Sequence, residues 1–174
     1  MRRQVIVGAI GAAAIALVAA GVQAATEDVN FPMNYRERLA NFTTVDRTDN
    51  GQVRVLYGSQ AALDAVKAGR PAPSGSVMVI EIYPAQRDPQ NVLLRGADGR
   101  LQRGGLASVY VMEKRTGWGA QYDPAVRTGE WEFASFTAAG QRAENRDMKA
   151  CQTCHLPRAQ DDFLMLPAAL LPVR

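Results

Sequence analysis

Four segments of the chain are rich in apolar residues that alternate with polar ones, and each is bordered by Gly or Pro. These segments are residues 51–59, 75–85, 104–119 and 129–140. A period of two places successive side chains on opposite faces of a sheet, and Gly and Pro are typical of the turns between strands. The pattern therefore predicts four strands of an antiparallel sheet.

Helical periodicity is confined to short stretches. Residues 34–42 have Asn34 at a candidate N-cap and an apolar pair one turn apart, and residues 59–69 begin at Ser59 and end at a Gly. Residues 142–155 form a third candidate helix. A four-helix bundle would need four long periodic segments. We therefore predict an α+β fold, mainly antiparallel β-sheet with a few short helices.

The N-terminal residues have the pattern of a secretory signal peptide. Arg2 and Arg3 precede a long apolar run, and a small-x-small cleavage site ends at Ala24. A membrane anchor is the alternative, since the run is long enough to reach across a bilayer. The Ala and Gly content of the run and its cleavage site favour a signal peptide that is cleaved off over a membrane anchor. We expect a signal peptide at 1–24 and a single domain at 25–174, exported to the periplasm.

Export changes the charge balance. The full chain has 20 Lys and Arg against 17 Asp and Glu, a net charge of +3, and removal of Arg2 and Arg3 leaves a net charge of +1. The sequence contains no basic cluster interleaved with aromatic residues. Nucleic acid is therefore not expected as a partner.

Both cysteines and the only histidine of the chain fall within five consecutive residues, Cys151-Gln-Thr-Cys154-His155. This spacing is typical of haem c, in which two thiols bind the haem vinyl groups and the adjacent imidazole is the iron ligand. A thioredoxin-type dithiol is one alternative, but such motifs precede a helix in a βαβ unit. Half of a zinc site is another, but no further Cys or His exists to complete four ligands. We predict one covalent haem c near the C-terminal end of a mono-haem cytochrome domain, with His155 as the metal ligand.

A single histidine also limits the sixth position of the iron. A second His ligand is excluded, so this position is open or is taken by a weak ligand such as Met. Met78 is the methionine candidate, and a Met ligand would make an electron-transfer cytochrome. An open position would bind small molecules such as NO or CO.

Several segments, in this order, resemble the cytochrome P-460 and cytochrome c′-beta family. They read NYRERLANF, VRVLYGS, GSVMVIEIY, VMEKRTGWG, GEWEFASF, CQTCH and DDFLML. The resemblance covers nearly the whole chain after the signal peptide. It implies a mostly antiparallel sheet, a homodimer, and one covalent c-type haem with an open distal side.

Two activities are known in this family. Cytochromes P-460 oxidise hydroxylamine and carry a lysine cross-linked to the haem, whereas cytochromes c′-beta bind nitric oxide in an apolar pocket. The lysine position corresponds to Ile80, and the strand around it has no lysine. The resemblance therefore implies a five-coordinate haem that binds NO or a similar small nitrogen species. Hydroxylamine oxidation or peroxide reduction is the alternative. A periplasmic electron-transfer partner is a further candidate.

The resemblance also indicates which side chains surround the haem. If Ile80 faces the haem, the strand period puts Met78 and Ile82 on the same wall, and Phe133 on another strand is a further distal candidate.

Polar candidates complete the predicted site. Hydroxylamine oxidation would need a distal base, for which Glu132, Glu144 and Asp147 are the candidates. Arg36 and Arg54 are candidates for bidentate pairing with the haem propionates.

Overall fold

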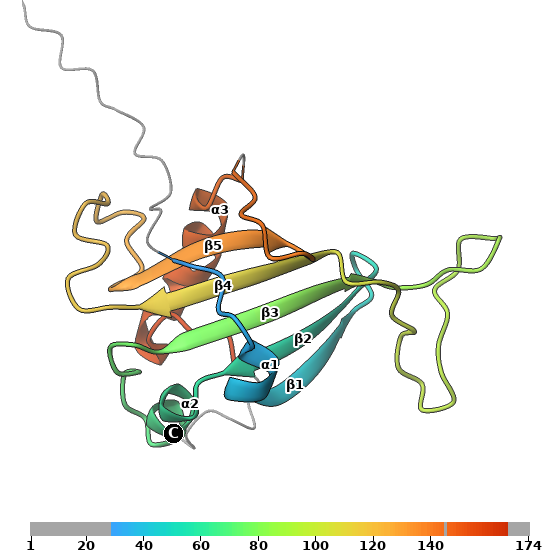
Figure 1. Cartoon of the computed structure of the whole chain (residues 1–174), viewed down its shortest axis with the longest axis horizontal. Helices are drawn as coiled ribbons and strands as arrows, with labels where there is room; N and C mark the ends of the chain where they lie inside the picture. The colour runs from blue at the N-terminus through green and yellow to red at the C-terminus, as the bar shows by residue number, and fades with distance from the viewer. Residues whose placement is uncertain (1–28, 145, 167–174) are drawn as a thin grey trace, which may run out of the picture.

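Five antiparallel strands form one sheet, in the order in which they occur along the chain (Figure 1). The computed structural model describes residues 29–144 and 146–166, so the predicted signal peptide lies outside the described residues. The strands are β1 Ala40–Arg47, β2 Gln52–Gly58, β3 Val77–Pro84, β4 Ser108–Lys114 and β5 Trp131–Thr137. Every neighbouring pair is antiparallel. The predicted fold class and the four predicted strands are therefore confirmed.

Short helices accompany the sheet in the described part of the chain. They are α1 Tyr35–Arg38, α2 Gln60–Lys67, α3 Lys149–His155 and the 3-10 helix η1 Leu156–Asp161. α2 confirms the helix predicted at 59–69, and it stops where Gly69 adopts a left-handed backbone, with φ at 66°. Among these helices none is long and apolar enough to cross a membrane.

The helix predicted over 34–42 is wrong beyond Arg38. Leu39 adopts an extended backbone, with φ −108° and ψ 145°, and Ala40 begins β1. Asn34 is left-handed, with φ at 56°, and its side chain makes no cap hydrogen bond. Asn34 does occupy the predicted N-cap position, since its carbonyl accepts the Arg38 N–H at 3.2 Å, but it caps α1 without a side-chain hydrogen bond.

β1 was missed by the sequence pattern because its alternation is broken. The pairing of β1 with β2 shifts between Asn41 and Thr43, as it does at a β-bulge. A bulge puts an extra residue into one strand, so that apolar side chains on one face no longer follow a period of two.

The third predicted helix begins at Lys149 rather than at residue 142. Arg142 forms a β-bridge with Phe136, and the Ala143 N–H donates to the Ser135 carbonyl at 2.9 Å. The backbone groups that a helix would use there are taken by the edge of β5, so only the last turns before the end of the motif are helical.

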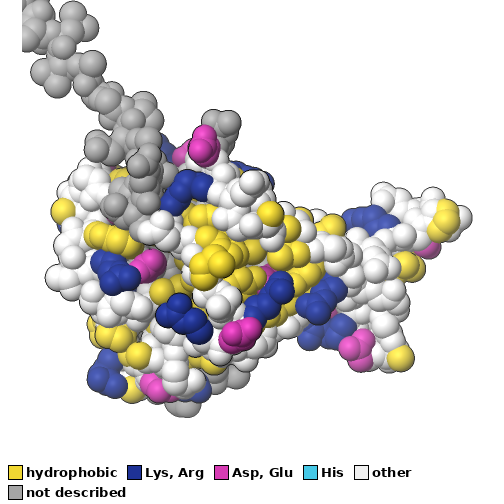
Figure 2. All heavy atoms as spheres, viewed as in Figure 1, with side chains coloured by type: hydrophobic (Ala, Val, Ile, Leu, Met, Phe, Trp, Pro, Cys, Tyr) yellow, Lys and Arg dark blue, Asp and Glu magenta, His cyan; other side chains and the backbone are white. Residues whose placement is uncertain are grey.

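The two faces of the sheet are covered by different parts of the chain. α1 and the segment before it cross one face (Figure 1), which is filled by buried side chains that include Val29, Tyr35, Val79, Val109 and Phe136. Figure 2 shows this side of the molecule, where apolar side chains lie among charged ones and no histidine is visible. α2, α3 and the segment after η1 pack on the other face, against a cluster that includes Leu63, Met112, Trp131 and Leu164.

An arm formed by residues 85–107 connects β3 to β4 and projects from one end of the sheet (Figure 1). A β-bridge between Ala85 and Arg103 closes its base. Arg100 then pairs with Asp46 of β1 at 2.8 Å, so the arm is also tied to the edge strand.

Candidate functional site

α3 presents both thiols to a pocket of about 630 Å³ that lies between it and the sheet. Cys151 and Cys154 are three residues apart, which places them on one side of a helical turn. Both are free, Cys151 half-buried and Cys154 exposed, and both line the pocket. Gln152 between them is buried away from solvent. The helix therefore offers two thiols to the same cavity.

His155, the last residue of α3, lines the same pocket. Its Nδ1 lies 2.6 Å from the carbonyl oxygen of Phe163. A carbonyl can only accept, so Nδ1 carries the hydrogen and Nε2 is left with its lone pair. Burial lowers the pKa of His155, although the bond to Phe163 opposes this shift. The imidazole is thus neutral, with Nε2 free to bind a metal.

The sheet forms the apolar wall of the pocket. Met78, Ile80 and Ile82 all line it from β3. Leu56 and Tyr110 flank Ile80 on the neighbouring strands. Further apolar lining comes from Phe42, Val45, Met112, Phe133, Leu164, Met165 and Leu166.

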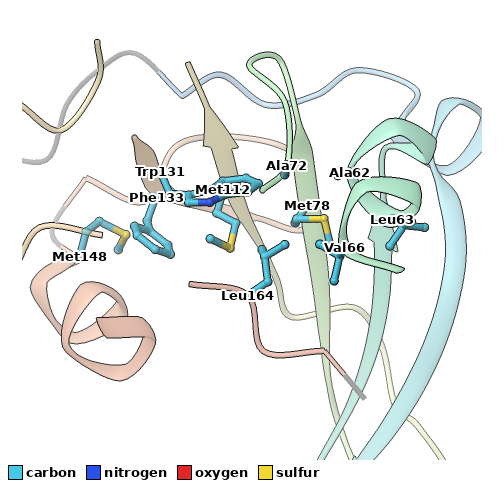
Figure 3. Close-up of a cluster of buried hydrophobic side chains, with 10 residues drawn as sticks. All are labelled: Ala62, Leu63, Val66, Ala72, Met78, Met112, Trp131, Phe133, Met148 and Leu164. Atoms are coloured by element: carbon cyan, nitrogen blue, oxygen red, sulfur yellow. The ribbon is translucent and has the colours of Figure 1, made fainter. Parts of the chain in front are cut away.

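Phe133 is the sheet residue in ring contact with the histidine, with ring centroids 5.1 Å apart. Figure 3 shows the Phe133 ring near α3, with Met148 on one side of it and Met112 on the other, and Leu164 between Met112 and Met78. Met78 and Met112 belong to the same buried cluster. The pocket is therefore continuous with the hydrophobic core on this face.

Arginines supply the positive charge of the pocket. Arg47, Arg54 and Arg146 line it. Arg54 donates to the side-chain oxygen of Gln52, at 3.0 and 3.3 Å. Burial, followed by the charge of Arg47, lowers the pKa of Arg54. A partly desolvated guanidinium of this kind favours an anionic group beside it.

Arg36, the other arginine candidate, does not line the pocket. It binds the buried carboxylate of Glu81 at 2.5 Å. Glu81 lies between Ile80 and Ile82 along β3, so its side chain is on the opposite face of the sheet. Arg36 therefore belongs to a separate polar cluster.

The three candidate carboxylates also lie apart from the described pocket lining. Glu132 is 1% exposed and accepts hydrogen bonds from Gln121 at 2.8 Å and from Tyr122 at 2.9 Å. It precedes the lining residue Phe133 on β5, which puts it on the other face. Glu144 and Asp147 are exposed and are not among the lining residues. In the described part of the chain, the pocket is lined by no Asp or Glu.

The alternatives for the two cysteines are not supported by their surroundings. Burial raises the pKa of the Cys151 thiol, and the neighbouring Cys154 and Asp147 raise it further. A reactive redox cysteine needs the opposite shift. The described residues contain no group of three or more His, Cys, Asp or Glu side chains that could hold a metal ion, so a protein-only zinc site is not formed there.

The three lysines of the chain are Lys67, Lys114 and Lys149, and none of them lines the pocket. Lys114 is on β4, where its ammonium binds both carboxylate oxygens of Asp162 at 2.9 and 3.0 Å. Ile80, at the position where the family resemblance implies a lysine, lines the pocket with an aliphatic side chain.

Sequence reasoning did not identify Tyr110, Arg146 or the backbone of Phe163 as parts of the site. Tyr110 was detectable, because the alternation of β4 puts it opposite Val109 and Val111. The role of Phe163 had no sequence signal, since its backbone carbonyl, not its side chain, contacts His155. A contact accepted by a backbone carbonyl leaves no pattern of residue types.

The family profile described as Cytochrome P460 matches residues 32–166, which include the sheet, α3 and the segment that contacts His155. A search of curated proteins gave no match.

Proposed function

The chain belongs to the Cytochrome P460 family and is a haem cytochrome of that group, and on that premise we propose that it is a periplasmic mono-haem protein whose five-coordinate iron binds nitric oxide. Cys151 and Cys154 would hold one haem c through thioether bonds, and His155 would bind its iron through Nε2. The observation that carries the proposal is the apolar wall that Met78, Ile80 and Ile82 form from β3, in a pocket whose described lining has neither lysine nor carboxylate.

The residues around the pocket suit such a haem. Its volume of about 630 Å³ is within the range of roughly 300–1,000 Å³ that small-molecule and cofactor sites occupy. The two free thiols and the unprotonated Nε2 of His155 are on one element. Arg54 offers a partly buried positive charge to a propionate. When bound, the haem supplies an iron centre able to take up a diatomic gas.

The chemistry of the wall supports gas binding over hydroxylamine oxidation. A neutral diatomic molecule needs no proton donor or acceptor, and aliphatic side chains keep water away from it. Oxidation of hydroxylamine needs a nearby base to take protons. The candidates Glu132, Glu144 and Asp147 do not line the pocket. A cross-link from lysine to the haem is also not supported, because no lysine lines the pocket. The ammonium of Lys114, on β4, is bound by Asp162.

The absorption spectrum of the reduced holoprotein tests the proposal. We expect a five-coordinate, high-spin ferrous spectrum that shifts on addition of NO or CO, and haem that stays attached on a denaturing gel. Replacement of both cysteines, Cys151→Ser with Cys154→Ser, should abolish the gel staining. A colourless protein, or a low-spin ferrous spectrum that neither gas changes, would overturn the proposal. Turnover of hydroxylamine with an artificial electron acceptor, above that of free haem, would establish the enzyme instead.

A methionine-ligated electron-transfer cytochrome is the second candidate, because Met78, Met112 and Met165 all line the pocket. Met78 and Met112 are buried and Met165 is 43% exposed. A sulfur ligand on the iron would give low-spin bands in the same ferrous spectrum. The spectrum therefore separates the two candidates in one measurement.

A further inference from the structure

The chain turns back toward His155 through two consecutive left-handed residues. Asp162 and Phe163 follow η1 with φ at 52° and 61°. Residues with a Cβ avoid this backbone region, and two in succession persist only where the surroundings hold them. We call Asp162 and Phe163 the corner.

The side chain of Asp162 is anchored on two separate elements. Its carboxylate binds the Lys114 ammonium of β4 at 2.9 and 3.0 Å and accepts the backbone N–H of Ala72 at 2.8 Å. The side chains of Lys114 and Asp162 are only 10% and 14% exposed. Solvent screens such a pair much less than an exposed one. The corner is thus fixed to the rigid sheet and to the loop after α2.

Phe163 is fixed independently. Its N–H donates to the Arg158 carbonyl at 2.7 Å. Its ring lies against Gly129, where a Cβ would be 2.9 Å from the Phe163 ring. With ring and N–H both held, the remaining polar group of the residue, its carbonyl, points at His155 Nδ1 from 2.6 Å.

We propose that the Lys114–Asp162 ion pair is a positioning device for the axial histidine. It holds the corner so that the Phe163 carbonyl keeps the hydrogen on Nδ1 and fixes the orientation of the imidazole that presents Nε2. This inference rests on the proposed function, because it assigns His155 to the iron. Carbonyl acceptors on Nδ1 fix the tautomer and raise the donor strength of a ligating imidazole. Lys114 and Asp162 thereby control the orientation and donor strength of the His155 imidazole, which neither of them contacts.

Asp162→Asn in the holoprotein is the decisive variant. Asn tolerates left-handed backbone and can still accept from the Ala72 N–H, so the substitution removes the ionic anchor and little else. We expect the Fe–His stretching band of the reduced protein to move to lower frequency. The His155 Nδ1 hydrogen should also exchange with deuterium between about two- and tenfold faster, as expected when a hydrogen bond of ordinary strength is weakened.

The chain offers a matched control. Asp46 also accepts from a cation, Arg100 at 2.8 Å, and from a backbone N–H, that of Leu101 at 3.0 Å. Asp46→Asn should leave the Fe–His band and the exchange rate unchanged, because this pair ties the arm to β1. Lys114→Met should reproduce the effect of Asp162→Asn, and the double variant should add nothing to either single one.

The outcomes separate this inference from the proposed function. If Asp162→Asn and Lys114→Met bind haem and gas with a wild-type Fe–His band and exchange rate, the positioning role is wrong and the proposed function stands. If the wild-type protein contains no covalent haem, both fail. Should Asp162→Asn not fold, Lys114→Met with the same two readouts decides the question. If neither variant folds, the pair is a structural anchor and the positioning role is overturned.

Discussion

Met78 belongs to the hydrophobic core and to the pocket wall at the same time. Its side chain is 6% exposed, and its Sδ is 3.0 Å from the place where a Cβ on Gly58 would lie. Leu63 of α2 approaches the same place at 3.1 Å. A thioether wedged between a strand and a helix is typical of methionine used as core filler.

Met78→Ala is therefore expected to change stability and not coordination. Removal of a buried methionine side chain should lower the free energy of unfolding by about 2–5 kcal/mol. The ferrous spectrum should remain five-coordinate. Urea unfolding and the reduced spectrum of one preparation measure both. Met165→Ala, at an exposed lining position, is the companion variant and should change neither. Loss of low-spin bands in either variant would instead identify that methionine as a ligand.

At the scale of elements, the strands were predictable because their side-chain period survives folding. β2 to β5 keep an unbroken register with their neighbours, and their Gly and Pro borders mark real turns. β1 has a bulge, and residues 142–143 bond to β5, so both departures come from pairing with a neighbouring strand. Pairing of this kind depends on tertiary contacts that a single-sequence pattern does not contain.

The candidate site also has parts that the sequence predicts and parts that depend on tertiary contacts. Cys151, Cys154 and His155 were predictable because their chemistry requires fixed spacing, and β3 placed Met78 and Ile80 by its period. The corner at Asp162 and Phe163 was not predictable, because its backbone angles and its acceptor are set by contacts with β4 and with Gly129. Local sequence favours no left-handed turn at a phenylalanine.

The contact between Gly129 and Phe163 gives a prediction at this scale. Gly129 has φ at +60°, and an added Cβ would meet the Phe163 ring at 2.9 Å. Gly75 has φ at +88° with nothing within 4 Å of its added Cβ. If backbone strain were the only effect, alanine would be less destabilising at Gly129 than at Gly75, because a φ of +60° is nearer the left-handed minimum.

Gly129→Ala should nevertheless be the more destabilising of the two. We expect it to lower the free energy of unfolding by about 1–3 kcal/mol more than Gly75→Ala, because the Phe163 ring must move. Thermal or urea unfolding of the two variants measures this difference. Equal losses, or a larger loss for Gly75→Ala, would show that the ring contact at Gly129 is unimportant.

At the scale of the whole molecule, the sheet separates the pocket from a buried polar cluster. The pocket lies on one face, and the cluster on the other face is centred on Glu81, which is 1% exposed. Four side chains donate to the Glu81 carboxylate: Tyr35 at 2.6 Å, Arg36 at 2.5 Å, Tyr83 at 2.9 Å and Tyr57 at 3.3 Å. Because β3 points successive residues to opposite faces, this cluster ties α1 to the back of the strand that forms the pocket wall.

The pKa of Glu81 makes this cluster a source of acid sensitivity. Desolvation favours its protonated form, but the hydrogen bonds from Tyr35, Arg36 and Tyr83 together outweigh desolvation and lower the pKa of Glu81. A carboxyl whose pKa is lower in the folded state stabilises the fold above its unfolded value of about 4.3. That contribution is lost as the pH falls through the folded value.

Glu81→Gln should therefore affect stability in a pH-dependent way and leave the pocket unchanged. We expect the variant to be less stable than wild type by about 2–4 kcal/mol at pH 7, since buried donors lose a charged acceptor. The difference should shrink as urea unfolding is repeated at lower pH, because wild type then loses the same interaction. Glu113→Gln, on the same face but paired with Arg115, should give a smaller loss at neutral pH. A difference that stays constant into acid would show that Glu81 is not ionised in the fold. A changed ferrous spectrum would show that the two faces of the sheet are coupled.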